Sequence, residues 1–194
     1  MGLIAKTSVR LKLRRAGLAD GRFLQPAPPS ARWSRLAFSV QPQQRTLWCW
    51  AAVAVSVADY YAPPTSWTQC SLASAQFGEA DCCANGASKS CNRVWRLDKA
   101  LSDVGALSQM DSAPADSGGL PAPVGREIDA GRPVGIRIGW DKGGHFIVLD
   151  GYRDDGAMVA LEDPLYGSSD LPTAILYRGY QGRGSWTHTY FTKP

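Results

Sequence analysis

The sequence lacks the patterns typical of membrane-spanning segments, zinc sites and secretory signals. Its 194 residues include only two histidines, and no apolar run approaches the roughly 20 residues of a membrane-spanning helix. The five cysteines contain no Cys-x-x-Cys pair of the kind typical of zinc sites, so neither a metal nor another cofactor is expected. Lys6 and Arg10 interrupt the apolar stretch near the start, so we expect no secretory signal and no membrane insertion.

Positive charge is concentrated at the beginning of the chain. Of 21 bases and 17 acids, residues 1–35 carry eight and one, which leaves 13 bases against 16 acids in residues 36–194. The later part is therefore slightly acidic and offers no footprint for nucleic acid. Residues 25–30 are rich in proline and exclude regular helix or a central strand. We divide the chain into a flexible basic arm, residues 1–35, and one globular domain, residues 36–194. The arm is a pro-segment, a targeting element or a tail without function.

Helical patterns precede strand patterns in this domain. Residues 49–61 are Ala-rich and apolar nearly all round, which predicts a buried helix that ends before Pro63. Helical spacing predicts further helices over residues 67–77, 93–104 and 124–130. A short strand is predicted at residues 36–40, and later strands at residues 133–138, 145–152, 158–161, 174–177 and 186–191. This order indicates an α+β domain with a cleft between its two halves.

Cys49 stands where the long apolar helix begins. A thiol is a good nucleophile as a thiolate, and a helix N-terminus and a neighbouring imidazole both favour that form. Trp48 and Trp50 flank the cysteine and would shield it from water. A buried cysteine that only packs in the core is the competing interpretation.

The second half of the domain offers a base and an acid. His145 follows two glycines and opens an apolar strand, a suitable place for a general base beside a cleft. Asp163 follows another predicted strand, and Pro164 after it prevents further ladder pairing. If the two strands are neighbours, the Asp163 carboxylate can orient the imidazole. Its rivals are Asp150, Asp154, Asp155 and Glu162, and we assign His188 a structural or surface role.

Gln43 lies six positions before Cys49. Acyl transfer requires hydrogen-bond donors aimed at the developing oxyanion, and a side-chain amide together with the N–H of the nucleophile can supply two. A surface glutamine is the alternative, because Gln41 and Gln44 stand beside it.

These residues occur in a specific order: a Gln, then Trp-Cys-Trp-Ala-Ala, then Gly-His-Phe-Ile-Val-Leu, then Glu-Asp-Pro. From about Gln41 to the end, the chain resembles papain-like bacterial cysteine peptidases, above all the effector proteases of plant-pathogenic bacteria and more distantly the double-glycine leader peptidases. The resemblance implies a papain-like fold with a helical N-terminal half and an antiparallel sheet in the C-terminal half. It also implies Cys49 as nucleophile, His145 as base, Asp163 as orienting acid and Gln43 as oxyanion donor.

The remaining cysteines, Cys70, Cys82, Cys83 and Cys91, form an even set in one short stretch. We favour two disulfides over a zinc site or reduced thiols; three pairings are possible, and a vicinal Cys82–Cys83 bridge would be strained. Disulfides imply an oxidising location, which conflicts with the missing secretory signal. We therefore favour secretion or delivery by a non-classical bacterial route over a cytoplasmic location.

The leading hypothesis is a monomeric peptidase that hydrolyses peptide bonds in a protein or peptide substrate through a thioester on Cys49. Amidase, deamidase or transglutaminase-like transfer would use the same residues. A catalytically silent binding module on the same scaffold is the third hypothesis. Trp67, Trp95 and Trp140 are candidates for an aromatic wall of the substrate cleft.

Overall fold

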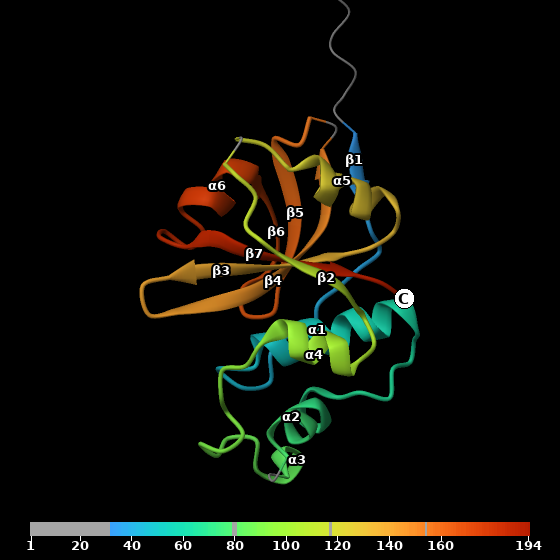
Figure 1. Cartoon of the computed structure of the whole chain (residues 1–194), viewed down its shortest axis with the longest axis vertical. Coiled ribbons are helices and arrows are strands. Elements are labelled where there is room, and N and C mark those ends of the chain that lie inside the picture. The colour runs from blue at the N-terminus through green and yellow to red at the C-terminus, as the bar shows by residue number, and fades with distance from the viewer. Residues whose placement is uncertain (1–31, 79–80, 117, 154) are drawn as a thin grey trace, which may run out of the picture. The chain divides into compact units, whose positions relative to one another are not determined.

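The computed structural model describes residues 32–78, 81–116, 118–153 and 155–194, and these residues form a helical half and a sheet half (Figure 1). The sheet has seven strands, all paired antiparallel, in the order β2-β7-β3-β4-β5-β6, with β1 paired to β4. The strands are β1 (Trp33–Arg35), β2 (Leu107–Ser112), β3 (Val134–Trp140), β4 (Gly143–Arg153), β5 (Met158–Asp163), β6 (Gly167–Pro172) and β7 (Ser185–Thr192).

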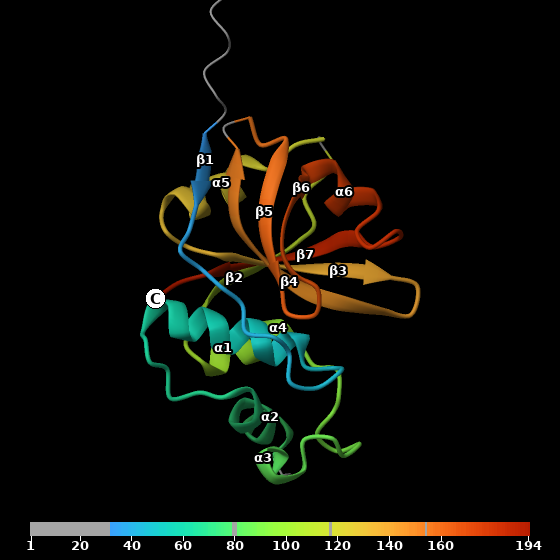
Figure 2. The ribbon, with the colours of Figure 1, turned by 180° about the vertical axis from the view of Figure 1, so that it is seen from behind.

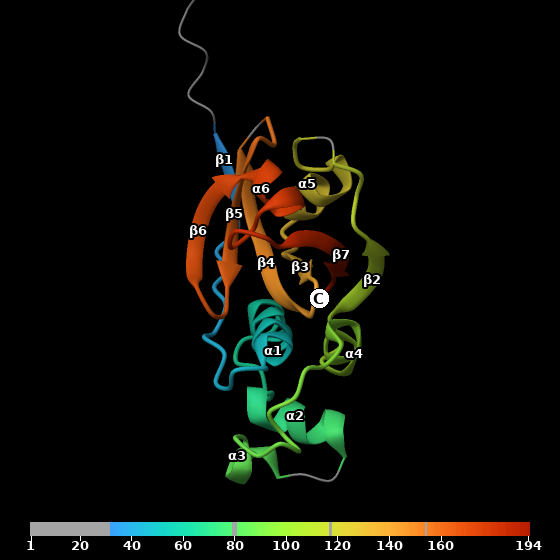
Figure 3. The same cartoon turned by 90° about the vertical axis from the view of Figure 1, so that its left-hand side faces the viewer.

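Four of the six described helices form the helical half. In Figures 1 and 3, α1 and α4 lie against the sheet, and α2 and α3 lie beyond them. The helices α5 and α6 pack on the sheet at its other end, away from α1 (Figure 2). The helices are α1 (Cys49–Tyr61), α2 (Gln69–Phe77), α3 (Cys82–Asn85), α4 (Leu97–Asp103), α5 (Ala122–Asp129) and α6 (Thr173–Arg178). None of them has the length and hydrophobicity needed to cross a bilayer.

The central strand β4 is buried on both of its faces. Phe146 and Val148 belong to the core that the sheet shares with α1, α2 and α4. Ile147 and Leu149 point the opposite way, into the core that lies under α5 and α6. A strand held between two cores is a rigid support, and β4 carries His145 near its first residue.

β1 joins the sheet through a close backbone approach. It pairs with the last residues of β4, and the Leu36 N–H donates to the Asp150 carbonyl at 2.8 Å. A Cβ on Gly151 would stand 2.8 Å from the Ser34 carbonyl oxygen, so only glycine fits there. The sheet thus includes residues 33–35 of the predicted arm, whereas residues 1–31 of that arm lie outside the described residues.

Helix α1 coincides with its predicted range, whereas three other predictions were wrong. Residues 36–40 form no strand: Phe38 and Val40 are buried, but the Val40 N–H donates to a Glu162 carboxylate oxygen rather than to a neighbouring strand. Residues 174–177 belong to helix α6, whose buried residues Thr173, Leu176 and Tyr177 follow helical spacing. The predicted helix 93–104 begins only at Leu97, because the residues before it bind the segment around Cys49.

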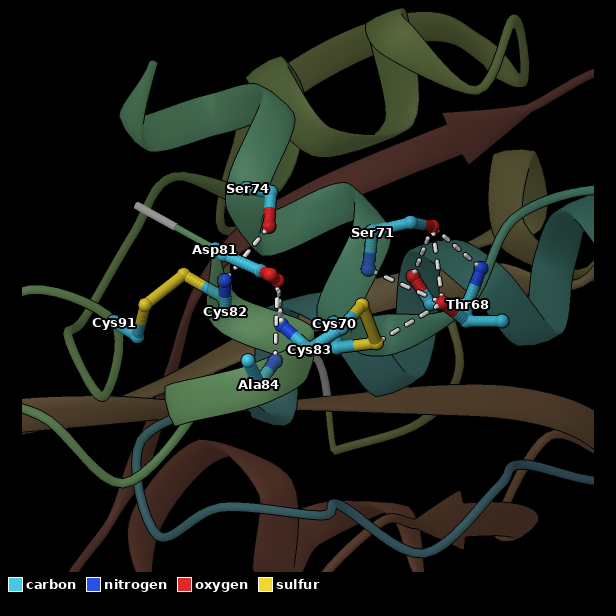
Figure 4. The surroundings of a disulfide bond; sticks show 9 residues. All are labelled: Thr68, Cys70, Ser71, Ser74, Asp81, Cys82, Cys83, Ala84 and Cys91. Atoms are coloured by element: carbon cyan, nitrogen blue, oxygen red, sulfur yellow. Dashed lines mark hydrogen bonds between the residues drawn. A yellow bond between two sulfur atoms is a disulfide. The ribbon is translucent and has the colours of Figure 1, made fainter. Parts of the chain in front are cut away.

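The four cysteines outside α1 are paired. Disulfides join Cys70 to Cys83 and Cys82 to Cys91, so the adjacent pair has two separate partners, as expected (Figure 4). The Asp81 carboxylate caps α3 by accepting from the Cys83 and Ala84 N–H groups at 3.1 Å. Cys49 is the free cysteine of the described residues.

Candidate active site

Cys49 is the first residue of α1, and its side chain is almost entirely buried. No described side chain caps this helix, and its first turn contains no acidic residue. The first N–H groups of α1 and the positive end of its dipole therefore act on the sulfur and on whatever binds beside it. The indoles of Trp48 and Trp50 are fully buried on either side, as the sequence suggested.

His145 connects the two halves of the site. Its Nε2 lies 2.8 Å from Asp163 Oδ1, and its side chain also forms a hydrogen bond with Cys49. Burial alone would lower the pKa of His145, but the bonds to Asp163 and Cys49 outweigh burial and raise the pKa to about 9. The imidazole is therefore protonated at neutral pH. With Nε2 turned to Asp163, the other ring nitrogen, Nδ1, is left for the cysteine.

Asp163 is the last residue of β5 and is 1% exposed. Besides the His145 contact, Oδ1 accepts from the Leu165 N–H at 2.7 Å and the Tyr166 N–H at 3.0 Å. Oδ2 accepts from the Tyr180 hydroxyl at 2.6 Å. Burial favours the neutral acid, but these donors hold the pKa of Asp163 below its usual value. The carboxylate is thus charged and fixed in one orientation.

Tyr180 is a site residue that sequence reasoning missed. It follows α6 and is 2% exposed, and burial and Asp163 together raise its pKa well above the ordinary value. Its hydroxyl is therefore a permanent donor to Asp163. The sequence around it, Gly-Tyr-Gln-Gly, is typical of a turn, and only the fold brings this turn to β5.

Replacing Tyr180 by phenylalanine is expected to keep the fold and to lower kcat by about 10-fold, because a hydrogen bond to a buried carboxylate is lost. The matched control is Tyr177→Phe, which removes a hydroxyl that donates to the Gly119 carbonyl instead. Steady-state kinetics on both variants checks the prediction. Equal kcat values for the two variants would contradict a role of Tyr180 through Asp163.

The structure places Gln43 beside the site but not in its cavity. Its Nε2 donates to the Arg45 and Thr46 carbonyls, both at 2.9 Å, and its buried Oε1 has no hydrogen-bond partner among the described residues. Its backbone N–H donates to the Pro164 carbonyl at 2.8 Å, next to Asp163. Of the four predicted residues, His145 thus contacts both Cys49 and Asp163, whereas both amide hydrogens of Gln43 are engaged in the loop that leads to Cys49.

The rivals of Asp163 lie elsewhere. Asp150 and Glu162 are buried together, and burial together with the Glu162 charge raises the pKa of Asp150 to about 6. Asp155 is exposed, and Asp154 lies outside the described residues. His188 is half-buried beside Tyr190, and burial and Arg137 lower its pKa. The hydrogen-bonded acid partner of His145 is Asp163 rather than one of the described rivals. The described residues contain no cluster of three or more metal-binding side chains.

A cavity of about 280 Å³ opens over Cys49 and His145. Trp95 and Trp140 line it, whereas Trp67 packs against the helical core. The rest of its lining comes from α1, the start of β4 and the loops around them, and is mostly apolar apart from Thr46 and Lys142: Thr46, Leu47, Trp50, Val94, Lys142, Gly143, Gly144, Phe146, Leu165 and Tyr166. A groove of this size, with the Cys49 thiol at its floor, has room for a short segment of an extended peptide.

The turn before His145 is held by Arg137. The guanidinium donates to the Gly143 carbonyl at 3.1 Å and to the Thr187 hydroxyl at 2.9 Å. A Cβ on Gly144 would lie 2.5 Å from Arg137 Nη2, so the glycine lets the arginine lie flat on the turn. Gly143 and Gly144 are the first two residues of β4, and both contact the Arg137 guanidinium.

Several solved structures are similar to this fold, including the following three. The peptidase domain of Streptococcus ComA, a bifunctional ABC transporter involved in quorum sensing, gives a TM-score of 0.52 at 16% identity, over 81% of this chain and 99% of that one. A double-glycine-motif protease from an AMS/PCAT transporter, in complex with the leader peptide, gives 0.45 at 21% identity, over 82% and 94%. The Pseudomonas avirulence protein AvrPphB gives 0.40 at 12% identity, over 81% and 98%. The first of these similarities shows that the chain has the papain-like peptidase fold.

Comparison of the sequence with protein families identifies the family within this fold. Residues 30–174 match the family described as papain-like cysteine protease AvrRpt2, so the chain belongs to that family and is a cysteine peptidase. No curated protein matches the chain by sequence. The predicted relationship to papain-like effector proteases is thereby confirmed.

Proposed function

We propose that this peptidase hydrolyses peptide bonds through a thioester on Cys49, with His145 as acid and base and Asp163 as the group that orients it. The observation that carries the proposal is the position of the His145 ring, which contacts Asp163 through Nε2 and Cys49 on its other side. A protonated imidazole beside a sulfur at a helix N-terminus is the arrangement in which a thiolate is favoured.

The chemistry takes place in two stages. The Cys49 sulfur attacks the substrate carbonyl, and His145 donates its proton to the leaving amine as the carbon–nitrogen bond breaks. Water then attacks the thioester carbon and gives one proton to the now neutral His145. The carbon–sulfur bond breaks, the carboxylic acid leaves, and the Cys49 thiolate beside a protonated His145 is regenerated. Asp163 keeps the ring in place through both stages and stabilises the imidazolium.

Two N–H groups are proposed to hold the oxyanion: the backbone N–H of Cys49 and the side-chain amide of Gln43. The first belongs to the uncapped end of α1. Gln43 would take this role by exchanging the Arg45 or the Thr46 carbonyl for the substrate oxygen. Its place in the loop that leads into α1 supports this proposal.

The test is intact-mass spectrometry without reductant, before and after iodoacetamide. We expect one fast alkylation at pH 7, because Cys49 is the free thiol of the described residues and lies beside a protonated imidazole. The Cys49→Ala variant should not be labelled. Slow labelling that the mutation does not change would overturn the proposal. Product analysis separates the acyl-transfer alternatives, since a cut backbone indicates a peptidase and released ammonia a deamidase or transferase.

The location and the domain division remain proposals as well. We propose that the part of the predicted arm that precedes β1 is an arm or pro-segment of the catalytic domain, and that the protein is secreted or delivered to its place of action. The paired cysteines support an oxidising environment at some stage, because such bridges are rare in reducing compartments.

A further inference from the structure

The connection between α3 and α4 contains no regular structure over residues 86–96. We call residues 91–95 of it the strap, and residues 43–48, which lead into Cys49, the lead-in loop. Two of the cavity-lining residues, Val94 and Trp95, belong to the strap, and two others, Thr46 and Leu47, belong to the lead-in loop. The two segments together form one wall of the cavity over the nucleophile.

Four hydrogen bonds join the strap to the residues around Cys49. Asn92 makes two of them: its Oδ1 accepts from the Leu47 N–H at 3.0 Å, and its Nδ2 donates to the Thr46 hydroxyl at 2.9 Å. The indoles on either side of the nucleophile make the others. Trp48 donates to the Cys91 carbonyl at 2.8 Å, and Trp50 donates to the Arg93 carbonyl at 3.1 Å.

The strap is held from its other side by the two small helices. The buried Cys82–Cys91 disulfide fixes its first residue to α3, and the Cys82 N–H donates to Ser74 of α2 at 2.9 Å (Figure 4). At its last residue, the Trp95 indole donates to Gln76 and packs edge-on against Phe77, with ring centroids 5.3 Å apart. The strap is therefore clamped at both ends while its middle holds the lead-in loop.

We infer that Asn92 and the Cys82–Cys91 disulfide are positioning elements of the peptidase, which hold the lead-in loop and the exposed Val94 in the geometry that receives the substrate; this inference rests on the proposed function. None of these residues reaches the reacting atoms. They act through Thr46, Leu47 and the two indoles. A displacement of about 1 Å in such a wall can cost up to 10²-fold in rate.

The second disulfide provides a matched control. Cys70–Cys83 joins α2 to α3 in the same part of the molecule, and its Cys70 sulfur contacts the Thr68 hydroxyl, away from the strap (Figure 4). It spans 13 residues, against nine for Cys82–Cys91. Loop-closure entropy therefore predicts that it stabilises the fold at least as much. If both disulfides served stability alone, removing Cys70–Cys83 would impair the protein at least as much as removing Cys82–Cys91.

The experiment measures kcat, KM, the melting temperature and the rate of Cys49 alkylation for two double variants, Cys82→Ser/Cys91→Ser and Cys70→Ser/Cys83→Ser. We expect the first to lower kcat/KM by about 10-fold or more, mainly through KM, and the second to change it by less than about threefold. Both should lower the melting temperature to a similar extent. Equal kinetic effects of the two double variants would overturn the inference.

Variants of Asn92 test the same inference with both disulfides intact. They therefore also test it if Cys82→Ser/Cys91→Ser fails to fold. Asn92→Leu removes both side-chain bonds to the lead-in loop and should raise KM about 10-fold. Asn92→Asp keeps an acceptor for the Leu47 N–H and can accept from the Thr46 hydroxyl, so it should restore most of the activity. Wild-type KM in Asn92→Leu would refute the positioning role, whereas an inactive, slowly alkylated wild type would refute the proposed function itself.

Discussion

Replacing Cys49 by alanine is expected to lower kcat by about 10⁴-fold or more, because no other described thiol can form the thioester. Substrate affinity should change little, since the cavity wall consists of other side chains. The measurement is single-turnover cleavage with a large excess of enzyme, together with direct binding of a substrate to the inactive variant.

The control for this prediction is Cys49→Ser, which keeps a nucleophile of similar shape but needs deprotonation by His145 before it attacks. It should also be impaired by several orders of magnitude, because the sulfur's ease of ionisation is lost. Full activity of Cys49→Ala would show that another residue carries the reaction. Loss of binding as well as turnover would point to misfolding, which a melting curve detects.

Replacing Asp163 by asparagine is expected to lower kcat/KM by about 10²- to 10⁴-fold, since the amide keeps the shape but loses the charge that stabilises the imidazolium. In the wild type, activity should fall as the pH rises through about 9, where His145 loses its proton. In the variant this alkaline limb should move to lower pH. Rate profiles between pH 5 and about 10 check both statements.

The contact between His145 and Asp163 also makes the free energy of unfolding depend on pH. The pKa of His145 is raised from 6.5 to about 9 on folding, so its stabilisation is fully present below pH 6.5 and is lost as the pH rises through 9. The pKa of Asp163 is lowered, so its contribution is present above its unfolded value of 3.8 and is lost as the pH falls through its folded one.

The free energy of unfolding that Asp163→Asn removes should therefore be largest between these limits. Urea unfolding at several pH values measures it. Asp155→Asn, which alters an exposed carboxylate, is the control and should change little. A cost of Asp163→Asn that did not diminish above pH 9 would contradict the charge pairing.

The local sequence pattern was sufficient to predict features that lie within a single helix or strand. Helix α1 matches its predicted range because an Ala-rich segment of thirteen residues, apolar apart from Ser56 and Asp59, is longer than an ordinary buried strand and is typical of a buried helix. Its first residue and the glycine-flanked histidine then identified the candidate nucleophile and base. Asp163 is predicted as the orienting acid because it follows a predicted strand and precedes Pro164, which ends the pairing of that strand.

What the sequence could not supply depends on contacts between distant segments. The strands β2 and β6 are mostly polar and exposed at the two edges of the sheet, so they carry no alternation to detect. Residues 93–96 have helical spacing with α4, but the Arg93 carbonyl accepts from the Trp50 indole and the Trp95 indole donates to Gln76, and these bonds keep the segment out of the helix. Tyr180 reaches Asp163 only because α6 returns the chain to the sheet.

The side chains at the floor of the cavity are buried, whereas those at its rim are exposed. Four apolar side chains there, Leu47, Val94, Leu165 and Tyr166, are 40%, 71%, 54% and 59% exposed, and they contribute to neither hydrophobic core. Cys49, His145 and Asp163 are buried and held by backbone and side-chain bonds from several elements. Mutations at the rim can therefore accumulate at almost no cost in stability, so selection can retarget the enzyme to new polypeptides while its chemistry is inherited unchanged.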